Sequence, residues 1–411
     1  MSEKFPKDWK IKPLGSFIKN IGDGGTPSTS DQSNFGGGIP WIVISDIQRE
    51  IWKTKTTLSE KGLKKSSSKL WKPQTVILST GATIGQVGIA KTKLATKQGI
   101  TGIECDDNLL PEYLYYFLKN NKHLLLSLSQ GSTIEEIRAP TLVKLNVSIP
   151  PLPEQKKIAS ILTSVDEVIE KTQSQINKLQ DLKKGTMNEL LTRGIGHIEF
   201  KDSELGKIPK GWEISDLKSL VVSHNSGIYK KKSEYGNGYN ILGVSDLYSC
   251  HIVDGQIFRK VPLTDEEVLE FSLKKGDLVY GESSLVREGI AKTVCVSENG
   301  EGTIFAWHTR RFSVSDNMDS IFLNYFLSSN ISRTYLTKVA TQTALTGITT
   351  KDYFGVKVVI PSFKEQQQIV TILSSIDNHI EKKQRKLQKN QYLKKSLMQD
   401  LLTGKVRVSV N

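Results

Sequence analysis

One segment of this 411-residue chain occurs twice, and it constrains the fold more than any other feature. The first copy begins "IPPLPEQKKIASILTSVDEVIEK" at Ile149, and the second begins "IPSFKEQQQIVTILSSIDNHIEK" at Ile360. Aligned without a gap as far as Thr192 and Thr403, the copies are identical at about half of their positions. Agreement over this length is far above chance, so the chain contains an internal duplication.

The apolar residues of each copy recur at alternating steps of four and three, which is the spacing of a coiled-coil seam. They are Ile158, Leu162, Val165, Ile169, Ile176 and Leu179 in the first copy and Ile369, Leu373, Ile376, Ile380 and Leu387 in the second. Each copy is predicted to be one long helix, roughly 58 Å from Glu154 to Thr192 at 1.5 Å per residue. We expect the two helices to pack antiparallel, with Thr172 and Lys383 as matching polar seam positions that fix the register. The alternative is two unrelated helices, each packed on its own domain.

The ends of both segments carry helix start and stop signals. Pro153 stands in the first turn, where a missing N–H costs no hydrogen bond, and Ser362 and Glu365 have the spacing of a capping box. Gly194 and Gly404 follow the last apolar turns, as C-terminal caps do. The signals therefore bound the predicted helices on both sides.

The segments that precede the two helices also correspond. "FPKDWKIKPLGSFI" resembles "IPKGWEISDLKSLV", "GIAK" occurs at Gly88 and at Gly289, and "YLYYFL" parallels "FLNYFL". Short β-branched runs broken by Gly, Pro and Asn predict strands, with one helix around "PEYLYYFLKN" and one around "SIFLNYFLSS". The expected fold class is α+β: two α/β-type globular domains with mixed or curled sheets, separated by two long antiparallel coiled-coil helices, in an internal two-fold pseudo-repeat.

This reading gives four parts with the boundaries 1–150, 151–196, 197–360 and 361–411, in which the first and third are globular and the others are spacer helices. The scaffold is repeated but the loops differ. Residues 53–72 hold seven lysines against one glutamate, whereas the basic residues of the second copy lie in "YKKKSEY" and "WHTRRF". If each globular part reads a ligand, the two parts read different ones.

The net charge of +13 and the pI near 9.3 favour a polyanionic partner, because Lys and Arg that neutralise phosphates release counterions. A basic surface that serves only solubility is the alternative. The polar start and the absence of an apolar run long enough for a bilayer predict a cytoplasmic protein without a membrane segment. Cys105, Cys250 and Cys295 have no paired or metal-ligand spacing and are expected to be reduced and buried.

Catalytic motifs are missing from the sequence. It has no GxxxxGK[ST] loop, no G-x-G-x-x-G after a strand and no methyltransferase signature around its prolines. Glu154 and Lys156 have the Glu-x-Lys form of metal-dependent nucleases, but no aspartate precedes them closely and Gln367 replaces the lysine in the repeat. The six histidines have no metal-ligand spacing. We therefore predict no catalytic site, no metal site and no cofactor in this chain.

The chain closely resembles the specificity (S) subunits of type I restriction-modification systems over essentially its whole length. The residues that carry the resemblance are "GGTPSTSDQSNFGGGIPWI", "LPEQKKIASILTSVDEVIE", "ELGKIPKGWEI", "IPSFKEQQQIVTILSSID" and "LKKSLMQDLLTGKVRV". The "GGTPS" element is absent from the second copy. The resemblance implies two target recognition domains, each reading one half of a bipartite double-stranded DNA site, and repeated helices that set the spacing.

The resemblance also implies partners. The repeated helices would dock methyltransferase (modification) subunits, two per chain because the chain is pseudo-symmetric. Restriction (helicase-nuclease) subunits would join through the complex. S-adenosylmethionine, ATP and Mg would be bound by these partner subunits and not by this chain.

Uncompensated cations are the residues expected to touch DNA phosphates, and forked or amide side chains in loops are those expected to read bases. The phosphate-contact candidates are Lys64, Lys65, Lys69, Lys72, Lys230, Lys231, Lys232, Arg310 and Arg311, and the base-reading candidates are Arg287, Gln86, Asn34 and Asn237. An ordinary solvated surface role is the alternative for each of them. Trp41, Trp52 and Tyr113 are expected to be core residues and not base-stacking platforms.

Two rival functions remain open from the sequence. A stand-alone sequence-specific DNA-binding protein would bind its site tightly without partners. A non-nucleic-acid coiled-coil scaffold would show no steep salt dependence with DNA.

Overall fold

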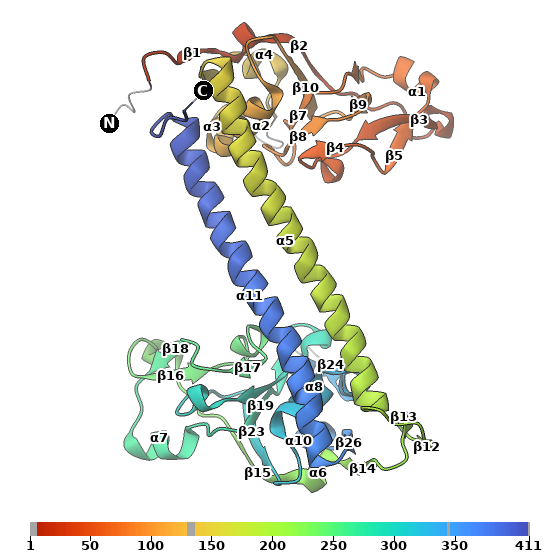
Figure 1. Cartoon of the computed structure of the whole chain (residues 1–411), viewed down its shortest axis with the longest axis vertical. Helices are drawn as coiled ribbons and strands as arrows, with labels where there is room; N and C mark the ends of the chain where they lie inside the picture. The colour runs from red at the N-terminus through yellow and green to blue at the C-terminus, as the bar shows by residue number, and fades with distance from the viewer. Residues whose placement is uncertain (1–5, 130–135, 343–345, 410–411) are drawn as a thin grey trace. The chain divides into compact units, whose positions relative to one another are not determined.

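The chain folds into two compact units (Figure 1). The computed structural model describes residues 6–129, 136–342 and 346–409. Unit 1 comprises Met1–Ser174 and Gln384–Asn411, and unit 2 comprises Gln175–Lys383. Unit 2 is therefore one continuous stretch of chain, whereas unit 1 is assembled from two stretches that are far apart in the sequence.

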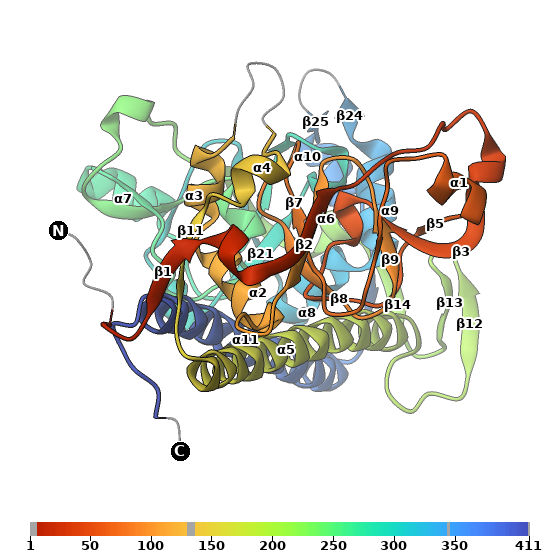
Figure 2. The same ribbon diagram turned by 90° about the horizontal axis from the view of Figure 1, so that it is seen from above.

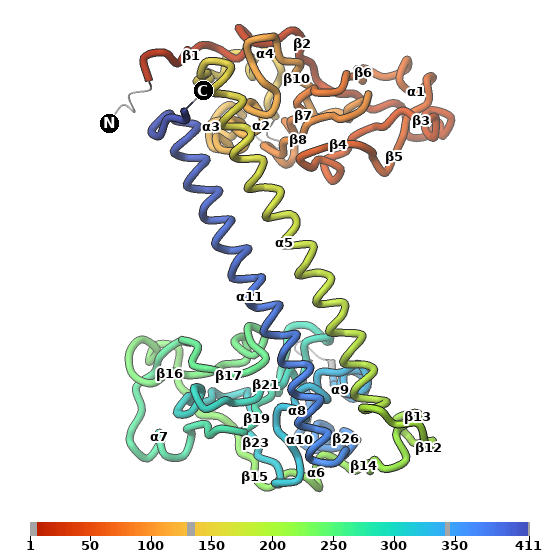
Figure 3. Tube along the Cα trace, in the orientation of Figure 1, coloured from red at the N-terminus to blue at the C-terminus, as the bar shows by residue number. Residues whose placement is uncertain are grey.

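The two predicted spacer helices are confirmed as α5 (Leu152–Arg193, 42 residues) and α11 (Phe363–Leu402, 40 residues). Each is continuous in the chain trace (Figure 3) and contributes one part to each unit. In unit 1, Leu162 of α5 belongs to the same core as Leu401 of α11. In unit 2, Leu191 of α5 joins Ile369 of α11. The start of α5 thus packs against the end of α11, and the end of α5 packs against the start of α11. The helices are therefore antiparallel, as predicted.

Seam residues are buried near the middle of the long helices, at Thr172, Ile176 and Ile380, as well as towards their ends. The two polar seam positions behave differently. Lys383 donates from Nζ to Oε1 of Gln175 on the other helix at 2.8 Å, which is a cross-helix contact able to fix register. The hydroxyl of Thr172 instead donates to the carbonyl of Val168 in its own helix at 2.6 Å. Only Lys383 therefore acts as the sequence predicts.

The helix ends follow the predicted signals except at one position. Pro153 lies in the first turn of α5, and Gly194 and Gly404 have positive φ angles of 67° and 72° beyond the two helix ends. Ser362 Oγ accepts from the backbone N–H of Glu365 at 3.3 Å, which is one half of a capping box. The other half is absent, because the Glu365 carboxylate accepts from Trp212 at 3.0 Å instead.

Unit 1 contains two mixed sheets. The five-stranded sheet has the order β2 (Ile18–Asp23), β10 (Ile100–Cys105), β7 (Val76–Ser79), β8 (Val87–Ala90), β4 (Glu50–Ile51). The four-stranded sheet has the order β5 (Thr56–Leu58), β3 (Phe35–Ile42), β9 (Leu94–Thr96), β6 (Leu70–Trp71). β1 (Lys10–Pro13) pairs with β11 (Asn146–Ile149), and the helices are α1 (Glu60–Lys64), α2 (Pro111–Asn120), α3 (Lys122–Ser127) and α4 (Ala139–Leu142). Parallel pairs β4–β8 and β3–β9 among antiparallel ones make both sheets mixed.

Unit 2 repeats this plan. Its five-stranded sheet has the order β15 (Val221–Ser226), β23 (Thr309–Val314), β19 (Leu278–Gly281), β21 (Thr293–Val296), β17 (Ile252–Val253). The three-stranded sheets are β18 (Arg259–Val261), β16 (Tyr239–Leu242), β22 (Ile304–Phe305) and β20 (Ser283–Ser284), β25 (Thr346–Gly347), β24 (Thr341–Gln342). The two-stranded pairs are β14 (Glu213–Asp216) with β26 (Lys357–Ile360) and β12 (Phe200–Ser203) with β13 (Gly206–Pro209), and the helices are α6 (Leu217–Leu220), α7 (Asp265–Phe271), α8 (Ser320–Ser328), α9 (Asn330–Val339) and α10 (Thr350–Phe354). The two five-stranded sheets match strand for strand, so the α+β prediction with an internal repeat is confirmed.

One predicted correspondence is wrong. The "GIAK" at Gly88 lies in β8, whereas the "GIAK" at Gly289 lies in the loop before β21. Ladder pairing aligns Ile89 with Cys295, because these residues oppose Val76 and Leu278 in equivalent strands. The four-letter match is therefore accidental, and the second unit has a longer loop at this point.

The Glu-Gln pair at the start of each long helix holds the globular part onto the helix in the same way in both units. In unit 1 the indole N–H of Trp9 donates to the buried carboxylate of Glu154 at 3.2 Å, and Trp212 and Glu365 form the same bond in unit 2. Arg407 also pairs with Glu154 at 2.8 Å. Glu154 is therefore a structural anchor with no free carboxylate surface, which removes the nuclease-like interpretation of its Glu-x-Lys sequence.

The glutamines beside them close the loop that leads into the central helix of each unit. Gln155 accepts from the backbone N–H of Leu110 at 2.8 Å, and Gln366 accepts from that of Asp319 at 2.8 Å. Both side chains are fully buried. The repeated letters thus encode equivalent interior contacts as well as the helix itself.

An aspartate in each long helix, buried in unit 1 and half-buried in unit 2, ties three elements together. In unit 1 the hydroxyl of Tyr116 donates to Asp166 at 2.9 Å, and Lys394 of α11 pairs with the same carboxylate. The counterparts in unit 2 are Tyr325, Asp377 and Lys183. Because each lysine comes from the other long helix, this triad fixes helix, helix and globular part in one network.

Candidate nucleic-acid interfaces

Two of the lysines predicted in unit 1 are available for a ligand. Lys64 ends α1 and Lys72 follows β6, and both side chains are exposed. Within the described residues neither has an ion-pair partner. A phosphate could therefore approach them without displacing an acidic group.

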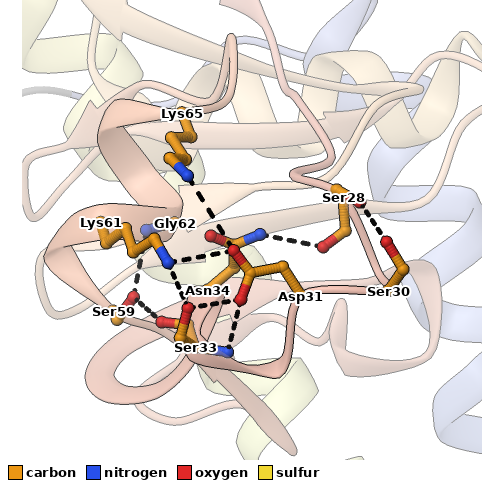
Figure 4. A network of polar contacts seen from close by, with 9 residues as sticks. All are labelled: Ser28, Ser30, Asp31, Ser33, Asn34, Ser59, Lys61, Gly62 and Lys65. Atoms are coloured by element: carbon orange, nitrogen blue, oxygen red, sulfur yellow. Dashed lines mark hydrogen bonds and ion pairs between the residues drawn. The ribbon is translucent and has the colours of Figure 1, made fainter.

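Lys65 differs from the prediction that this cluster lacks acids. Its Nζ lies 3.9 Å from the carboxylate of Asp31, which also pairs with Lys61 at 3.0 Å (Figure 4). The hydroxyl of Ser33 and then Lys61 lower the pKa of Asp31 to about 2. Asp31 stands 30 residues before Lys61 and 34 before Lys65, so the local sequence did not reveal it.

Lys69 is exposed but already held in place. Its Nζ donates to the carbonyl of Ile21 at 3.4 Å and lies 5.8 Å from the ring centre of Trp71. Gln86 is exposed on the turn before β8, where its backbone N–H donates to Ser79 at 2.8 Å. The amide of Gln86 is thus presented to solvent from an anchored turn, as base readout requires.

Asn34 cannot present its amide to a DNA groove in this structure. The residue is 1% exposed, and its Nδ2 donates to the carbonyl of Ser28 at 2.9 Å (Figure 4). It shapes the segment before β3 from inside, and we do not retain it among the candidate base readers. The sequence offered no signal that this amide would be buried.

Only part of the basic run Lys230–Lys232 of unit 2 is available to bind a ligand. Lys230 is half-buried and pairs with Glu267 of α7 at 2.8 Å, and this bond lowers the pKa of Glu267. Lys231, Lys232 and Asn237 are exposed. The prediction of an uncompensated cluster is therefore corrected for Lys230 and kept for the following lysines.

Arg310 and Arg311 form ion pairs within unit 2, beside the five-stranded sheet. As neighbours in β23 they point to opposite faces. Arg310 pairs with Glu282 at 2.7 Å, and Arg311 pairs with Asp277 at 3.6 Å. Since both guanidinium groups already face carboxylates, the prediction that they lack compensating acids is wrong.

Equivalent helices of the two units carry opposite charge. α1 follows β5 and its N-cap Ser59, and α7 follows β18 and its N-cap Thr264. The first has the sequence EKGLK and the second DEEVLEF. An acidic helix repels phosphate where a basic one attracts it, so α1 favours an approaching phosphate and α7 opposes it.

Exposed apolar side chains are the features that the sequence did not reveal. Trp41 and Tyr113 are core residues as predicted, but Trp52 is 61% exposed, contrary to prediction. In unit 2 the side chains of Leu285 and Val286 are 89% and 58% exposed. A single exposed apolar side chain is ordinary, but Leu285 and Val286 line one surface hollow together with Val244 and Tyr248, which makes this group a candidate contact surface.

The chemistry of the remaining groups is inert. Burial raises the pKa values of Cys105 and Cys295 to about 12, so both thiols are protonated at neutral pH. All three cysteines are free, but only Cys295 is fully buried, whereas Cys105 and Cys250 are half-buried. In the described part of the chain no group of three His, Cys, Asp or Glu residues has a metal-binding arrangement. Among the same residues, no helix is both long and apolar enough to cross a bilayer.

Comparison with protein families gives two matches within this chain. A family model described as the type I restriction modification DNA specificity domain matches residues 6–181 and again residues 209–389. Each match begins near the Trp that anchors a globular part and ends within a long helix. The family repeat therefore coincides with the structural one.

Comparison with individual proteins covers nearly the whole chain. The specificity subunit of the type I restriction enzyme MjaVIII from Methanocaldococcus jannaschii is 30% identical over 413 residues, covering 98% of this chain and 94% of the relative. The EcoKI specificity subunit from Escherichia coli is 24% identical, with coverage of 89% and 82%. The solved S subunit of a type I restriction-modification system from M. genitalium aligns with a TM-score of 0.62 at 15% identity, covering 98% of this chain and 97% of that chain. The fold is thus shared along the full length.

Proposed function

The chain belongs to the type I restriction-modification DNA specificity family, and on that basis we propose that each of its units reads one half of a bipartite DNA site. Such a chain is a non-catalytic recognition subunit. The matching strand order of the two five-stranded sheets supports the proposal, because one scaffold is used twice with different loops. Different loops on one scaffold give two different half-sites.

Within each half-site the exposed residues divide by chemistry. Lys64, Lys69, Lys72, Lys231 and Lys232 are the proposed phosphate contacts, and Gln86, Asn237 and Arg287 are the proposed base readers. The exposure of these side chains supports the assignment, whereas the paired or half-buried cations Lys65, Lys230, Arg310 and Arg311 are expected to contribute less.

The long helices are the proposed docking surface for two methyltransferase subunits. Leu182 of α5 is 55% exposed and Leu393 of α11 is 50% exposed, and these leucines occupy the same position of the repeat. One lies in unit 2 and the other in unit 1. Two equivalent exposed leucines, one in each unit, suit two copies of one partner.

The remaining chemistry is assigned to partner subunits. We propose that S-adenosylmethionine is bound by the methyltransferase subunits, and that ATP and Mg are bound by restriction subunits that join through the complex. The assembly would act in the cytoplasm, where it meets double-stranded DNA.

Substitution of the two leucines tests the stoichiometry. Co-expressed with its methyltransferase subunit, the chain should carry two copies by native mass spectrometry. Leu182→Glu and Leu393→Glu should each remove one copy, and the double variant should remove both, because a buried charge opposes docking. Leu269→Glu is the matched control, since Leu269 is 86% exposed on α7. Two bound copies on the double variant would contradict the docking proposal.

The lysines of unit 1 can be tested by salt dependence. Replacing Lys64 and Lys72 with alanine should lower the slope of log K against log salt by about 1.8, because each phosphate contact contributes about 0.9. Lys61→Ala with Lys65→Ala is the control, and its effect should be smaller because Asp31 already neutralises these cations. An unchanged slope for the first pair would exclude both lysines as phosphate contacts.

The same measurements separate the rival functions. A stand-alone DNA-binding protein would bind its site with full affinity when no methyltransferase is present. A scaffold that does not bind nucleic acid would show no salt-dependent affinity for any duplex. We expect specific binding that depends on the docked methyltransferase subunits.

A further inference from the structure

The loop between β19 and β21 of unit 2 displays two aliphatic side chains to solvent. It runs from Glu282 to Lys292, whereas the equivalent loop of unit 1 runs only from Thr80 to Gln86. Leu285 is 89% exposed on this longer loop. In unit 1 the aliphatic residue of the shorter loop, Ile84, is buried at 5% exposure. The extra residues of unit 2 thus turn aliphatic groups outward.

These side chains are not on a loose segment. The hydroxyl of Tyr248 donates to Ser284 Oγ at 3.0 Å and lies 2.9 Å from the carbonyl of Gly289, which joins both ends of the turn. Ser284 Oγ also accepts from the backbone N–H of Val286 at 3.2 Å. A turn held from inside while its tip is apolar and exposed is arranged for contact with something outside the chain.

The surroundings of the turn are cationic. Arg287 donates from Nε to the carbonyl of Thr337 at 2.9 Å, and Arg333 donates from Nη2 to the carbonyl of Glu288 at 2.8 Å. Lys292 ends the loop, and the carboxylate of Glu282 at its start is already paired with Arg310. The charged neighbours are the cations Arg287, Lys292, Arg310 and Arg333 against the acids Asp246, Glu282 and Glu288. An apolar tip within a net positive surface favours DNA over an apolar protein surface.

The width of the element that carries the turn selects the groove. β20 pairs with β25, which pairs with β24, and neighbouring strands lie about 4.8 Å apart. A major groove about 12 Å wide admits a two-stranded ribbon such as the β20–β25 pair, whereas a minor groove about 6 Å wide does not. Figure 2 shows β24 and β25 on the side of unit 2 that is away from the long helices α5 and α11. The turn is thus clear of the proposed methyltransferase docking face.

Resting on the function proposed above, we propose that Leu285 and Val286, with Val244 and Tyr248, form a subsite for the 5-methyl group of thymine. These four residues line one shallow hollow on the surface of unit 2. In the major groove the methyl group of thymine is the apolar feature that distinguishes it, and aliphatic side chains recognise it by contact. The half-site read by unit 2 therefore contains at least one thymine whose methyl group is sensed.

Deoxyuridine substitution tests this subsite because it removes only the methyl group. Binding of the complex with its methyltransferase subunits is measured on duplexes in which each thymine of the mapped site is replaced in turn. One or two replacements, all in the half-site of unit 2, should weaken binding about four-fold each, as expected for one lost methyl contact. The double variant Leu285→Ala, Val286→Ala should bind the thymine and uracil duplexes equally.

Matched controls keep the outcome interpretable. Leu269→Ala and Ile257→Ala remove equally exposed aliphatic groups of the same unit, which are 86% and 87% exposed, and should leave thymine sensitivity intact. The subsite is excluded if the double variant keeps the sensitivity, if the sensitive thymines lie in the other half-site, or if none is sensitive. It is also excluded if the variant loses methyltransferase subunits instead. Failure of the wild-type complex to select any bipartite site would instead reject the proposed function itself.

Discussion

Replacing residues 1–150 with the corresponding domain of another specificity subunit is expected to change one half of the recognised DNA site completely and to leave the other half unchanged. The reason is that the loops which differ between the units lie in the globular parts, whereas the helices are repeated. Mapping methylated sites across a genome that carries the hybrid subunit measures both halves at once.

The junction of this hybrid is set by the structure. β11 ends at Ile149, so a boundary at residue 150 keeps the β1–β11 pair within the transferred domain. The incoming domain must supply a Trp at the position of Trp9. Without it, the buried Glu154, which remains in the hybrid, would lose its indole hydrogen-bond donor. The reciprocal exchange of residues 197–360 is the control and should change the other half-site. If either exchange altered both halves, one reader per half-site would be wrong.

Lengthening α5 is expected to change the distance between the half-sites and nothing else. Four helix-forming residues inserted after Lys171 add about 6 Å and slightly more than one turn, so the seam is nearly preserved. A duplex rises about 3.4 Å per base pair, so about 6 Å corresponds to one or two base pairs. We therefore predict the same half-site bases with a spacer longer by one or two pairs, read from the methylated sites.

Two features of the structure limit this change. α11 is not lengthened, and the bond from Lys383 to Gln175 lies close to the insertion, so part of the added length is absorbed by bending. Each added pair also rotates the second half-site by roughly 34°. Four residues inserted after Gly255, in an exposed loop of unit 2 away from the proposed contact residues, are the control and should leave the spacer unchanged. An unaltered spacer in the α5 variant would show that the helices do not set the distance.

The helices could be predicted because their signal is local. Apolar spacing, Pro153 at the start and Gly194 at the end are all local to the helix that they describe, and the repeat supplied the apolar spacing and a terminal glycine twice. The antiparallel packing followed from the need to bury two matching stripes. The central helices α2 and α8 could be read from the sequence for the same reason.

The candidate site could not be predicted as well, because its residues are defined by contacts between distant segments. Arg311 looked uncompensated until the fold brought Asp277 next to it from the turn before β19. Lys65 is balanced by Asp31 in the same way. The outward turn of Leu285 depends on loop length and on Tyr248, which the sequence places far away. Charge in a sequence thus identifies the class of ligand but not the cation that meets it.

The division of the long helices between the units determines the order in which the chain can fold during synthesis. Unit 2 is continuous and is complete once Lys383 is free, but unit 1 needs Gln384–Asn411 as well. Until Leu401 is synthesised, the hydrophobic core of unit 1 that contains Leu162 is incomplete. At about 5–20 residues per second, the first reader waits roughly 10–50 seconds for the last segment of its own core. The part that is made first is therefore finished last, and it is the part exposed to chaperones and proteases for longest.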